Sequence, residues 1–503
     1  MIGGLSKINR YLLAGAGAIG LLLAGTPVAK AQNLQEIQAQ IDSMQATIKA
    51  LQQQVQDAQS QAAAAKSAAA EAGKSDLDLK VKWKGAPEFS SGDGKFKMKI
   101  RGRLQADYNN IDQDFRITGR PDVNAAEIRR ARLGVEGVVF YTVEYKFEVD
   151  FANDAVSVKD AYLEYTGLAE DLGLRFGNFK TFNTLDDMTS SRFITFMERA
   201  ALVEAWGFDR QIGAAAIYAK DHFTISGGVF GPPVANEETW LEDVKTAAAR
   251  VTVAPINREV NGVHQVVHLG ASWRTRDGSE HDRADPLDPF SDEFFRYRAR
   301  GADLHLADRF ISTPQIFDRD TFWGLEGAVI FGPWHVVGEY TQLEADVARQ
   351  LFVGSDPTYE GWYIETGWFL TGETRSYSHG EFGRIKVKNP VIGGGKGTGW
   401  GAWQIAGRYD VLDLTDKAQT MTGIIDSNDE VAFACGACGE QTTWLIGINW
   451  WLNDYTRFQF NYNESDIKGG PLLLTSGAAT GNSANSNDGA NIKGFGMRAQ
   501  VDW

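Results

Sequence analysis

The sequence predicts an all-β protein, a transmembrane barrel with a water-filled interior, and three observations predict it. Residues 94–108 (GKFKMKIRGRLQADY) alternate between apolar or small residues and polar ones, five of which are cationic. Successive side chains of a strand point to opposite faces, so such a strand has one apolar and one charged face. The last residues, 495–503, repeat the alternation. Trp and Tyr lie near many strand ends, which is typical of aromatic girdles at two membrane interfaces.

Residues 1–31 have the pattern of a secretory signal peptide. Two basic residues precede an apolar run over 11–24, and Ala29-Lys30-Ala31 fits a cleavage site with small residues at both ends. The alternative is a membrane anchor, but the apolar run is short and is followed by Gly25-Thr26-Pro27. We therefore expect an exported protein whose mature chain begins near Gln32.

The charge balance excludes one class of partner. Three of the 50 basic residues precede Gln32, so the mature chain carries 47 basic and 65 acidic residues, a net charge of −18. Proteins that bind nucleic acid need a basic surface to neutralise phosphates. We therefore predict no nucleic-acid partner, although a locally basic interior is compatible with this composition.

Residues 34–58 carry small or apolar side chains at intervals of three and four, at positions 34, 37, 41, 44, 48, 51, 55 and 58. This is a heptad seam, which is too narrow to be buried without partner helices. Ile at several seam positions is compatible with a dimer and with a trimer. A single helix lying on the barrel is the alternative. We assign 32–80 to a periplasmic coiled coil followed by a fraying helix and linker (59–80), and 81–503 to the barrel.

The alternating stretches predict sixteen antiparallel strands, an even number, as closed single-chain barrels prefer. They lie near 95–108, 128–138, 143–151, 158–165, 173–179, 209–219, 222–230, 245–253, 266–274, 322–331, 334–343, 361–370, 400–411, 442–451, 455–464 and 494–503. A further candidate, 295–300 (FRYRAR), falls inside a long external loop, 275–321, once the short turns are placed at the periplasmic end. Two connections, 254–265 and 371–399, fit poorly as short periplasmic turns.

The connection 180–208 is long and mixes aromatic residues with Thr, Ser, Asp and Arg. It follows the fifth predicted strand and is therefore the third external loop. A barrel of this width leaves an open aqueous channel unless something narrows it. We expect this loop to fold inward and constrict the channel, where its polar residues would set selectivity. A loop lying outside the channel is the alternative.

Cationic side chains on the polar strand faces and in this loop are candidates for lining a path for anions. Guanidinium is planar and always charged, and it meets phosphate with two hydrogen bonds. The alternative is that nearby carboxylates neutralise these charges and merely keep the lumen wet. The candidates are Lys97, Lys99, Arg101, Arg103, Arg130, Arg132, Lys180, Arg192, Arg199 and Arg210.

Stretches spread over about residues 85–503 resemble the phosphate-selective porin family of the O and P type. They are GRLQADYNN, RRARLGVEG, KDAYLEYTG, LRFGNFKT, the TSS…FMER run, YIETGWFLTGE, GAWQIAGRYDVLDL and RAQVDW. The resemblance implies a homotrimer of sixteen-stranded outer-membrane barrels of a Gram-negative bacterium, surrounded by outer-membrane lipid and constricted by the third loop. It matches Arg103 and Arg130 to the narrowest anion site, with Arg132 a weaker match, and a trimeric seam at 34–58.

One departure from the family concerns its lysine cluster near the constriction. Here the loop has Lys180 but otherwise Asp186, Asp187, Glu198 and Glu204. The predicted function is therefore passive diffusion of small anions such as phosphate or pyrophosphate through a mildly anion-selective pore. The alternatives are a general, weakly selective porin or a structural tether of the outer membrane. A saccharide channel would need an aromatic lumen, and most aromatic residues here are predicted to face outward.

Other chemistry is not predicted. No G-x-S-x-G motif precedes a helix and no His lies in a recognisable Ser or Asp motif, so we predict no enzyme. The two cysteines, Cys435 and Cys438, are too few for a structural zinc site. In an exported protein they are better explained as a small surface disulfide. We predict no cofactor and no metal.

Overall fold

The structure is a computed structural model, and its two compact units are Met1–Asp78 and Leu79–Trp503. The predicted signal peptide and Cys435 lie outside the described residues. These are 33–72, 79–83, 85–234, 245–261, 263–278, 294–313, 315–348, 352–353, 356–393, 399–416, 422–424, 438–470 and 489–503.

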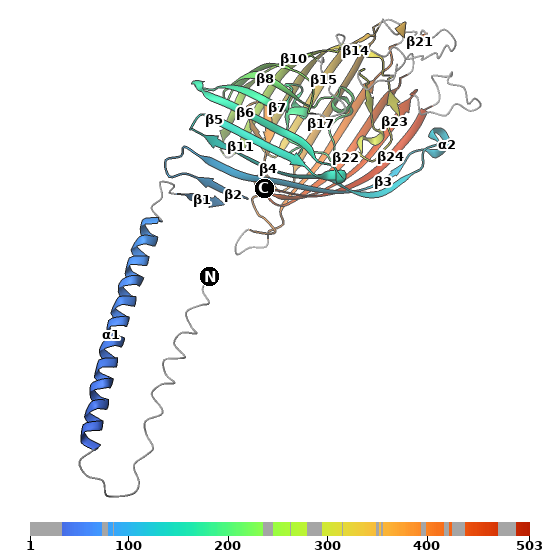
Figure 1. The fold of residues 1–503 in the computed structure, drawn as a ribbon. Helices are drawn as coiled ribbons and strands as arrows, with labels where there is room; N and C mark the ends of the chain where they lie inside the picture. Colours follow the sequence, from blue (N-terminus) through green and yellow to red (C-terminus); the bar gives the residue numbers. More distant parts are fainter. Residues whose placement is uncertain are drawn as a thin grey trace. The chain divides into compact units, whose positions relative to one another are not determined.

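The first unit contains one helix, α1 (Asn33–Ala72), of 40 residues (Figure 1). Its sequence is rich in Ala, Gln and Lys, which favour helix. The helix continues to Ala72, so much of the segment predicted to fray is helical. Apolar seam residues from Ile41 to Val55 are exposed in the single chain. Among the described residues, no helix has both the length and the hydropathy needed to span a bilayer.

The second unit is a closed antiparallel barrel, because its last strand pairs with its first (Figure 1). All sixteen predicted strands are present. They are β3 (Lys97–Asp112), β4 (Val123–Val139), β5 (Val143–Asp150), β6 (Ser157–Ala169), β7 (Leu172–Lys180), β8 (Arg210–Ala219), β9 (Phe223–Phe230), β10 (Lys245–Val260), β11 (Val263–Asp277), β14 (Phe317–Phe331), β15 (Trp334–Val347), β17 (Thr358–Phe369), β20 (Ala402–Asp413), β22 (Glu440–Asn453), β23 (Thr456–Lys468) and β24 (Gly489–Asp502).

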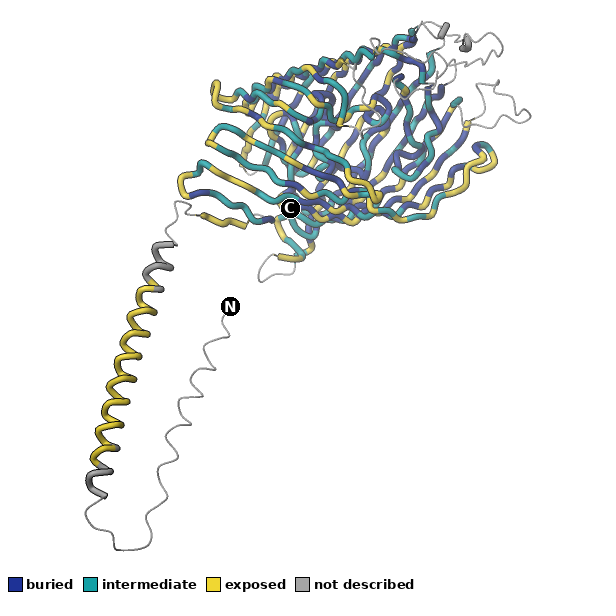
Figure 2. Tube along the Cα trace, in the orientation of Figure 1, coloured by how far each residue is buried: buried dark blue, intermediate teal, exposed yellow. Residues whose placement is uncertain are grey.

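Buried and exposed residues alternate along many of these strands, as Figure 2 shows. In β3 the polar Arg103, Gln105 and Asp107 are buried inside the barrel, whereas Leu104 between them is 42% exposed on its outer surface. The apolar side chains therefore face the membrane and the polar ones face the lumen, as the sequence predicted.

Closure of the barrel requires a glycine in β3. Gly102 exchanges backbone hydrogen bonds with Trp503, at 3.1 and 3.3 Å. A Cβ at position 102 would lie 2.0 Å from the indole of Trp503, so no larger residue fits there without displacing it.

The barrel has two unlike ends. Short connections follow β4, β6, β8, β10, β14 and β22, and both termini of the barrel lie at the same end, which we name the turn end. The opposite end, which carries most of the long connections, is the loop end. The connection 254–265, which looked too long for a short turn, is a short turn in the structure. The reason is that β10 continues to Val260 and β11 begins at Val263. FRYRAR belongs to the long connection 278–316 at the loop end, as expected, and contributes β12 (Arg298–Ala299).

The connection 370–401 was expected at the turn end and is truly long. It does not form a short turn, since it carries a hairpin of β18 (Ser376–Ser378) and β19 (Glu381–Gly383) that contacts the lumen wall.

The remaining short elements are β1 (Lys80–Trp83), β2 (Pro87–Ser90), α2 (Phe115–Thr118), η2 (Ala152–Asp154), α3 (Leu185–Met188), α4 (Ala201–Ala205), η3 (Gly301–Asp303), β13 (Ile311–Ser312), β16 (Phe352–Val353) and β21 (Thr422–Ile424).

Candidate functional site

Residues 181–209, here named the inward loop, leave β7 and cross the lumen to the opposite wall. Backbone carbonyls of the loop accept hydrogen bonds from that wall: Thr195 from Asn449 (2.9 Å) and Gln459 (3.0 Å), and Ile194 from Arg457 (2.8 Å). The predicted inward fold of this loop is therefore present, and it narrows the barrel.

Glycines on the far wall make room for the loop. A Cβ at Gly447 would lie 3.0 Å from the ring of Phe196, and one at Gly496 would lie 2.8 Å from Met197 Sδ. Phe196 and Met197 are fully buried. Small residues on one side of the lumen therefore let the loop seat closely against the strands of the far wall, β11 to β24.

Charged residues between the loop and this far wall are buried and paired. Arg408 donates to Glu365 at 2.7 Å, and Arg375, from the 370–401 connection, donates to the same carboxylate at 3.2 Å. Glu326 of β14 binds Arg250 of β10, the strand adjacent to the far wall, at 2.6 Å. This half of the lumen is filled by protein, which leaves the other half for solvent.

The near wall, β3 to β8, lines a series of three cavities instead. The central cavity has a volume of about 360 Å³ and lies between the near wall and the inward loop. Ten cationic side chains and three carboxylates line it. The cations are Arg101, Arg103, Arg130, Arg132, Lys146, Arg175, Lys180, Arg192, Arg199 and Arg210, and the carboxylates are Glu148, Asp160 and Glu381.

A cavity adjoins the central one at each end. The loop-end cavity, about 360 Å³, shares Arg130 and Arg199 with it. The turn-end cavity, about 270 Å³, shares Lys146 and Tyr162 with it. Shared lining residues place the three cavities next to one another along the near wall, and we name the series the passage.

The structure brings all ten predicted residues to this passage. Eight line the central cavity, and Lys97 and Lys99 line the turn-end cavity. Alternation along β3 and β4 places the strand residues, and the seat of the inward loop places Arg192 and Arg199. The expectation that carboxylates lie close by is also met, since Arg132 pairs with Glu148 at 3.1 Å and Asp150 at 2.7 Å.

Two of the three carboxylates that line the central cavity are each shared by two cations. Glu148 serves two arginines, because Arg103 also lies 3.8 Å from it. Asp160 likewise serves both Lys146 (2.5 Å) and Arg210 (2.6 Å). Asp150 and Asp209 add a second carboxylate at each site, 2.7 Å from Arg132 and 3.9 Å from Arg210, but neither of them lines the cavity.

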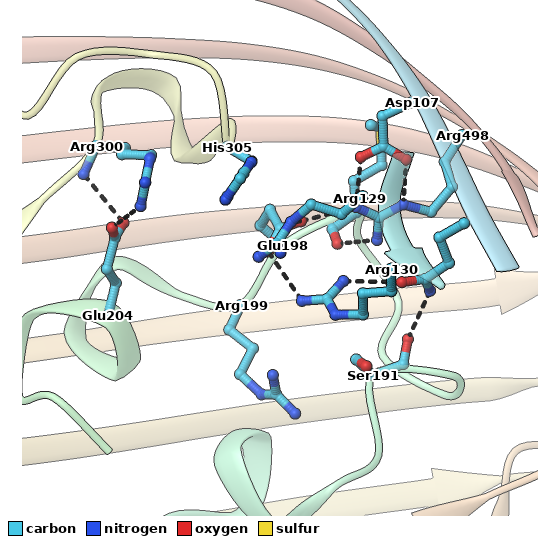
Figure 3. A network of polar contacts seen from close by, with 12 residues as sticks. Asp107, Arg129, Arg130, Ser191, Glu198, Arg199, Glu204, Arg300, His305 and Arg498 are labelled. Carbon is cyan, nitrogen blue, oxygen red and sulfur yellow. Dashed lines mark hydrogen bonds and ion pairs between the residues drawn. The ribbon is translucent and has the colours of Figure 1, made fainter. Parts of the chain in front are cut away.

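Glu198 of the inward loop is the centre of a network at the loop-end cavity (Figure 3). It accepts from Arg129 at 2.8 and 3.0 Å and from Arg498 at 2.7 Å, and Arg130 lies 3.5 Å away. Burial alone would raise the pKa of Glu198, but these three arginines hold it well below its ordinary value. The carboxylate therefore stays charged and fixes the loop to β4 and β24.

Sequence reasoning missed Arg129, because strict alternation points it away from the lumen. Gln105 of β3 pairs with Arg130 while Ala106 pairs with Ile128, so Arg129 is an extra residue in a β-bulge. A bulge re-aims the side chain of the extra residue, and here two consecutive arginines reach Glu198. Lys146 and Arg175 were also missed, although both alternate with apolar neighbours in β5 and β7.

Arg192 shows how burial and crowding affect a cation at the central cavity. Burial and the neighbouring charge of Arg101 lower its pKa to about 10, and Asp502, 3.6 Å away, partly offsets this. The guanidinium is therefore still protonated at neutral pH. The central cavity keeps its positive charge under ordinary conditions.

A closed barrel of sixteen strands, narrowed by a loop and traversed by a charged passage, defines a membrane channel of the porin class. The model of the family "Phosphate-selective porin O and P" matches residues 98–470, and the chain belongs to this family. The protein is therefore an outer-membrane porin of a Gram-negative bacterium.

Two relatives and one solved structure are similar to this chain. An uncharacterised protein of Caulobacter vibrioides is 34% identical over 78% of this chain and 73% of its own. Porin O of Pseudomonas aeruginosa is 26% identical over 76% of this chain and 86% of its own. The anion-selective porin from Comamonas acidovorans is 11% identical, with a TM-score of 0.45 over 81% of this chain and all of its own.

Proposed function

We propose that the channel passes small anions, such as phosphate or pyrophosphate, by passive diffusion along the near wall. The observation that carries this proposal is the lining of the central cavity, where ten cations face three carboxylates. A solute that leaves water for this narrow space loses part of its hydration, and fixed guanidinium groups replace it only for an anion. The description of the matching family, phosphate-selective porins, supports this direction of selectivity.

The overlap of the cavities explains how an anion would move without being trapped. Arg130 and Arg199 line two cavities, so an anion held by them at the loop end is already in contact with the central cavity. Lys146 has the same position toward the turn end. A carboxylate or a backbone carbonyl of the protein competes with the anion for each of these cations. This competition keeps the binding of each anion weak enough for release.

The same proposal covers orientation and assembly. Both termini of the barrel lie at the turn end, which we assign to the periplasm, so α1 would be periplasmic. Its exposed apolar seam requires partner helices, and three copies of the chain forming a coiled coil would bury it. The partners are then two further copies of the chain and the outer-membrane lipid that surrounds the apolar outer face.

The test is a reversal potential of single channels in a planar bilayer under a KCl gradient, repeated with phosphate added. We expect preference for chloride over potassium, and a current that falls when millimolar phosphate occupies the passage. A reversal potential on the potassium side would contradict the proposal. Anion preference without block by phosphate would retain the channel for anions and exclude phosphate as its particular solute.

A general, weakly selective porin is the second candidate, and the loop-end cavity favours it. There five arginines face four carboxylates, Asp187, Glu198, Glu204 and Asp303, so the charge at this cavity is nearly balanced. A reversal potential near zero, with no effect of phosphate, would favour this candidate. The structural tether rests on α1 alone and does not exclude a channel.

A further inference from the structure

A small cavity lies where the inward loop meets the 370–401 connection, and it shares Arg192 and Phe193 with the central cavity. Its volume is about 10 Å³, which is space for a single particle the size of a water molecule or a monatomic ion. Four arginines line it, from three separate parts of the chain: Arg192 of the inward loop, Arg375 and Arg384 of the connection, and Arg457 of β23.

Arg457 is the residue whose charge is left without a partner. Its side chain is 1% exposed, and among the described residues it forms no ion pair with a carboxylate. It donates to the carbonyl of Ile194 at 2.8 Å and to the amide oxygen of Gln500 at 3.0 Å, while its Nε has no hydrogen-bond partner. A buried, unpaired cation is costly, so this position favours an anion.

The other three arginines share carboxylates and leave an excess of positive charge. Arg192 and Arg384 both pair with Asp502. Arg375 pairs with Glu365, which also serves Arg408. The second carboxylate at the cavity, Asp454, accepts the backbone N–H of Val387 at 2.8 Å. Four guanidinium groups thus face two carboxylates around a space of atomic size.

We propose that this cavity binds a single halide ion, chloride under physiological conditions. Its volume excludes phosphate, and its charge favours an anion over water. The ion would accept from Arg457 and tie β23 to the tips of the inward loop and the 370–401 connection. It would thereby hold both constricting segments in place. The inference does not depend on anion selectivity of the passage, because Arg375, Arg384 and Arg457 line this cavity and not the central one.

Anomalous diffraction from crystals of the complete protein equilibrated with sodium bromide tests the site directly. We expect a bromide peak within hydrogen-bond distance of the Arg457 guanidinium, and its loss in Arg457→Gln. Arg101→Gln is the matched control, since Arg101 lines the central cavity and not this one, and its crystals should keep the peak. Absence of a peak from the wild-type cavity would overturn the proposal.

Thermal unfolding in detergent gives a second, independent readout. At equal ionic strength, the wild type should have a Tm higher by about 2–4 °C in sodium chloride than in sodium gluconate, because the ion binds only the folded state. The rise should saturate with chloride and vanish in Arg457→Gln, but persist in Arg101→Gln. Equal Tm values in the two salts for the wild type would contradict the proposal. If Arg457→Gln does not fold, the presence or absence of the bromide peak in the wild type still tests the proposed halide site.

Discussion

The two walls of the lumen carry the same kinds of residue and use them differently. On the near wall, the side chains of Arg132, Arg210 and Arg175 are 11%, 13% and 22% exposed although each has a carboxylate partner. On the far wall, Arg408 and Arg498 are completely buried. These three near-wall arginines thus keep part of their side chains accessible from the passage, whereas Arg103 and Arg130 of the same wall, 5% and 6% exposed, are buried like the far-wall arginines.

The position of the inward loop determines which wall of the lumen is buried and which is exposed to solvent. It occupies the far half of the lumen, seats on glycines and turns its ion pairs into buried ones. Burial strengthens a pair but leaves no site for a solute, whereas partial exposure leaves charge that a passing anion can reach. The loop therefore does two things at once: it narrows the channel, and it leaves only the cationic wall exposed to solvent.

The largest effect is expected from breaking a far-wall pair. Glu365→Gln removes the carboxylate that serves both Arg408 and Arg375 and leaves two buried cations unpaired. We expect a loss of about 3–5 kcal/mol in the free energy of unfolding. Because Glu365 also accepts from Thr195 of the inward loop, single-channel conductance should rise. Urea unfolding in detergent measures the first effect and bilayer recording the second.

Glu148→Gln on the near wall is the matched control. Arg132 keeps Asp150, and Arg103 keeps its hydrogen bond to Ser191 Oγ, so the loss should be clearly smaller. Equal losses for Glu365→Gln and Glu148→Gln would show that the two walls do not differ in burial as described.

A second test of the far wall displaces the inward loop by steric overlap, and so examines how closely the loop packs against this wall. Gly447→Val places methyl groups where Phe196 packs, and overpacking of this kind costs about 1–3 kcal/mol. The loop should shift toward the near wall or detach, and the conductance should change accordingly. In Gly407→Val, a Cβ meets only the Leu445 carbonyl, at 3.7 Å, so wild-type conductance is expected. Wild-type conductance in Gly447→Val would argue against close packing of the inward loop on the far wall.

On the near wall, substitutions should change selectivity more than stability. Arg103→Gln and Arg130→Gln each remove one cation from the central cavity, but Glu148 keeps Arg132, and Glu198 keeps Arg129 and Arg498. We expect a several-fold lower anion preference in each variant, with a smaller loss of stability than in Glu365→Gln, because no buried carboxylate is left without a partner. Reversal potentials and urea midpoints of the same preparations measure both. A large loss of stability with unchanged selectivity would reverse the roles assigned to the walls.

The smallest effect is expected from pH. Burial raises the pKa of Glu381, one of three carboxylates at the central cavity, and the nearby charge of Arg250 only partly offsets this. Glu381 should therefore take up a proton at a higher pH than an exposed glutamate, and anion preference should rise as the pH falls through that value. Glu381→Gln should already show the higher preference at pH 7 and lose the dependence. A dependence that persists in this variant would assign it to another group.

Much of the fold was predictable because alternation is local. Sixteen strands, their facing and the long loop-end connection around FRYRAR followed from a two-residue period and from connection lengths. Strand ends were less predictable, since β10 and β11 extend beyond their apolar stretches to Val260 and from Val263. The disulfide of Cys435 and Cys438, the signal peptide and the coiled coil stay predictions.

What the sequence alone determined is which side chains face the lumen: each of the ten cations singled out by alternation or by the long loop lines the passage. What only the tertiary structure decided is which part of the lumen stays open. That depends on contacts between residues far apart in the chain, such as Asp186 with Glu339 and Met197 with Arg498, which are 153 and 301 positions apart. It also depends on the bulge at Arg129 and on the folding of 370–401 into the barrel. No short-range pattern encodes such contacts, because they arise only when the closed barrel brings its walls to face one another.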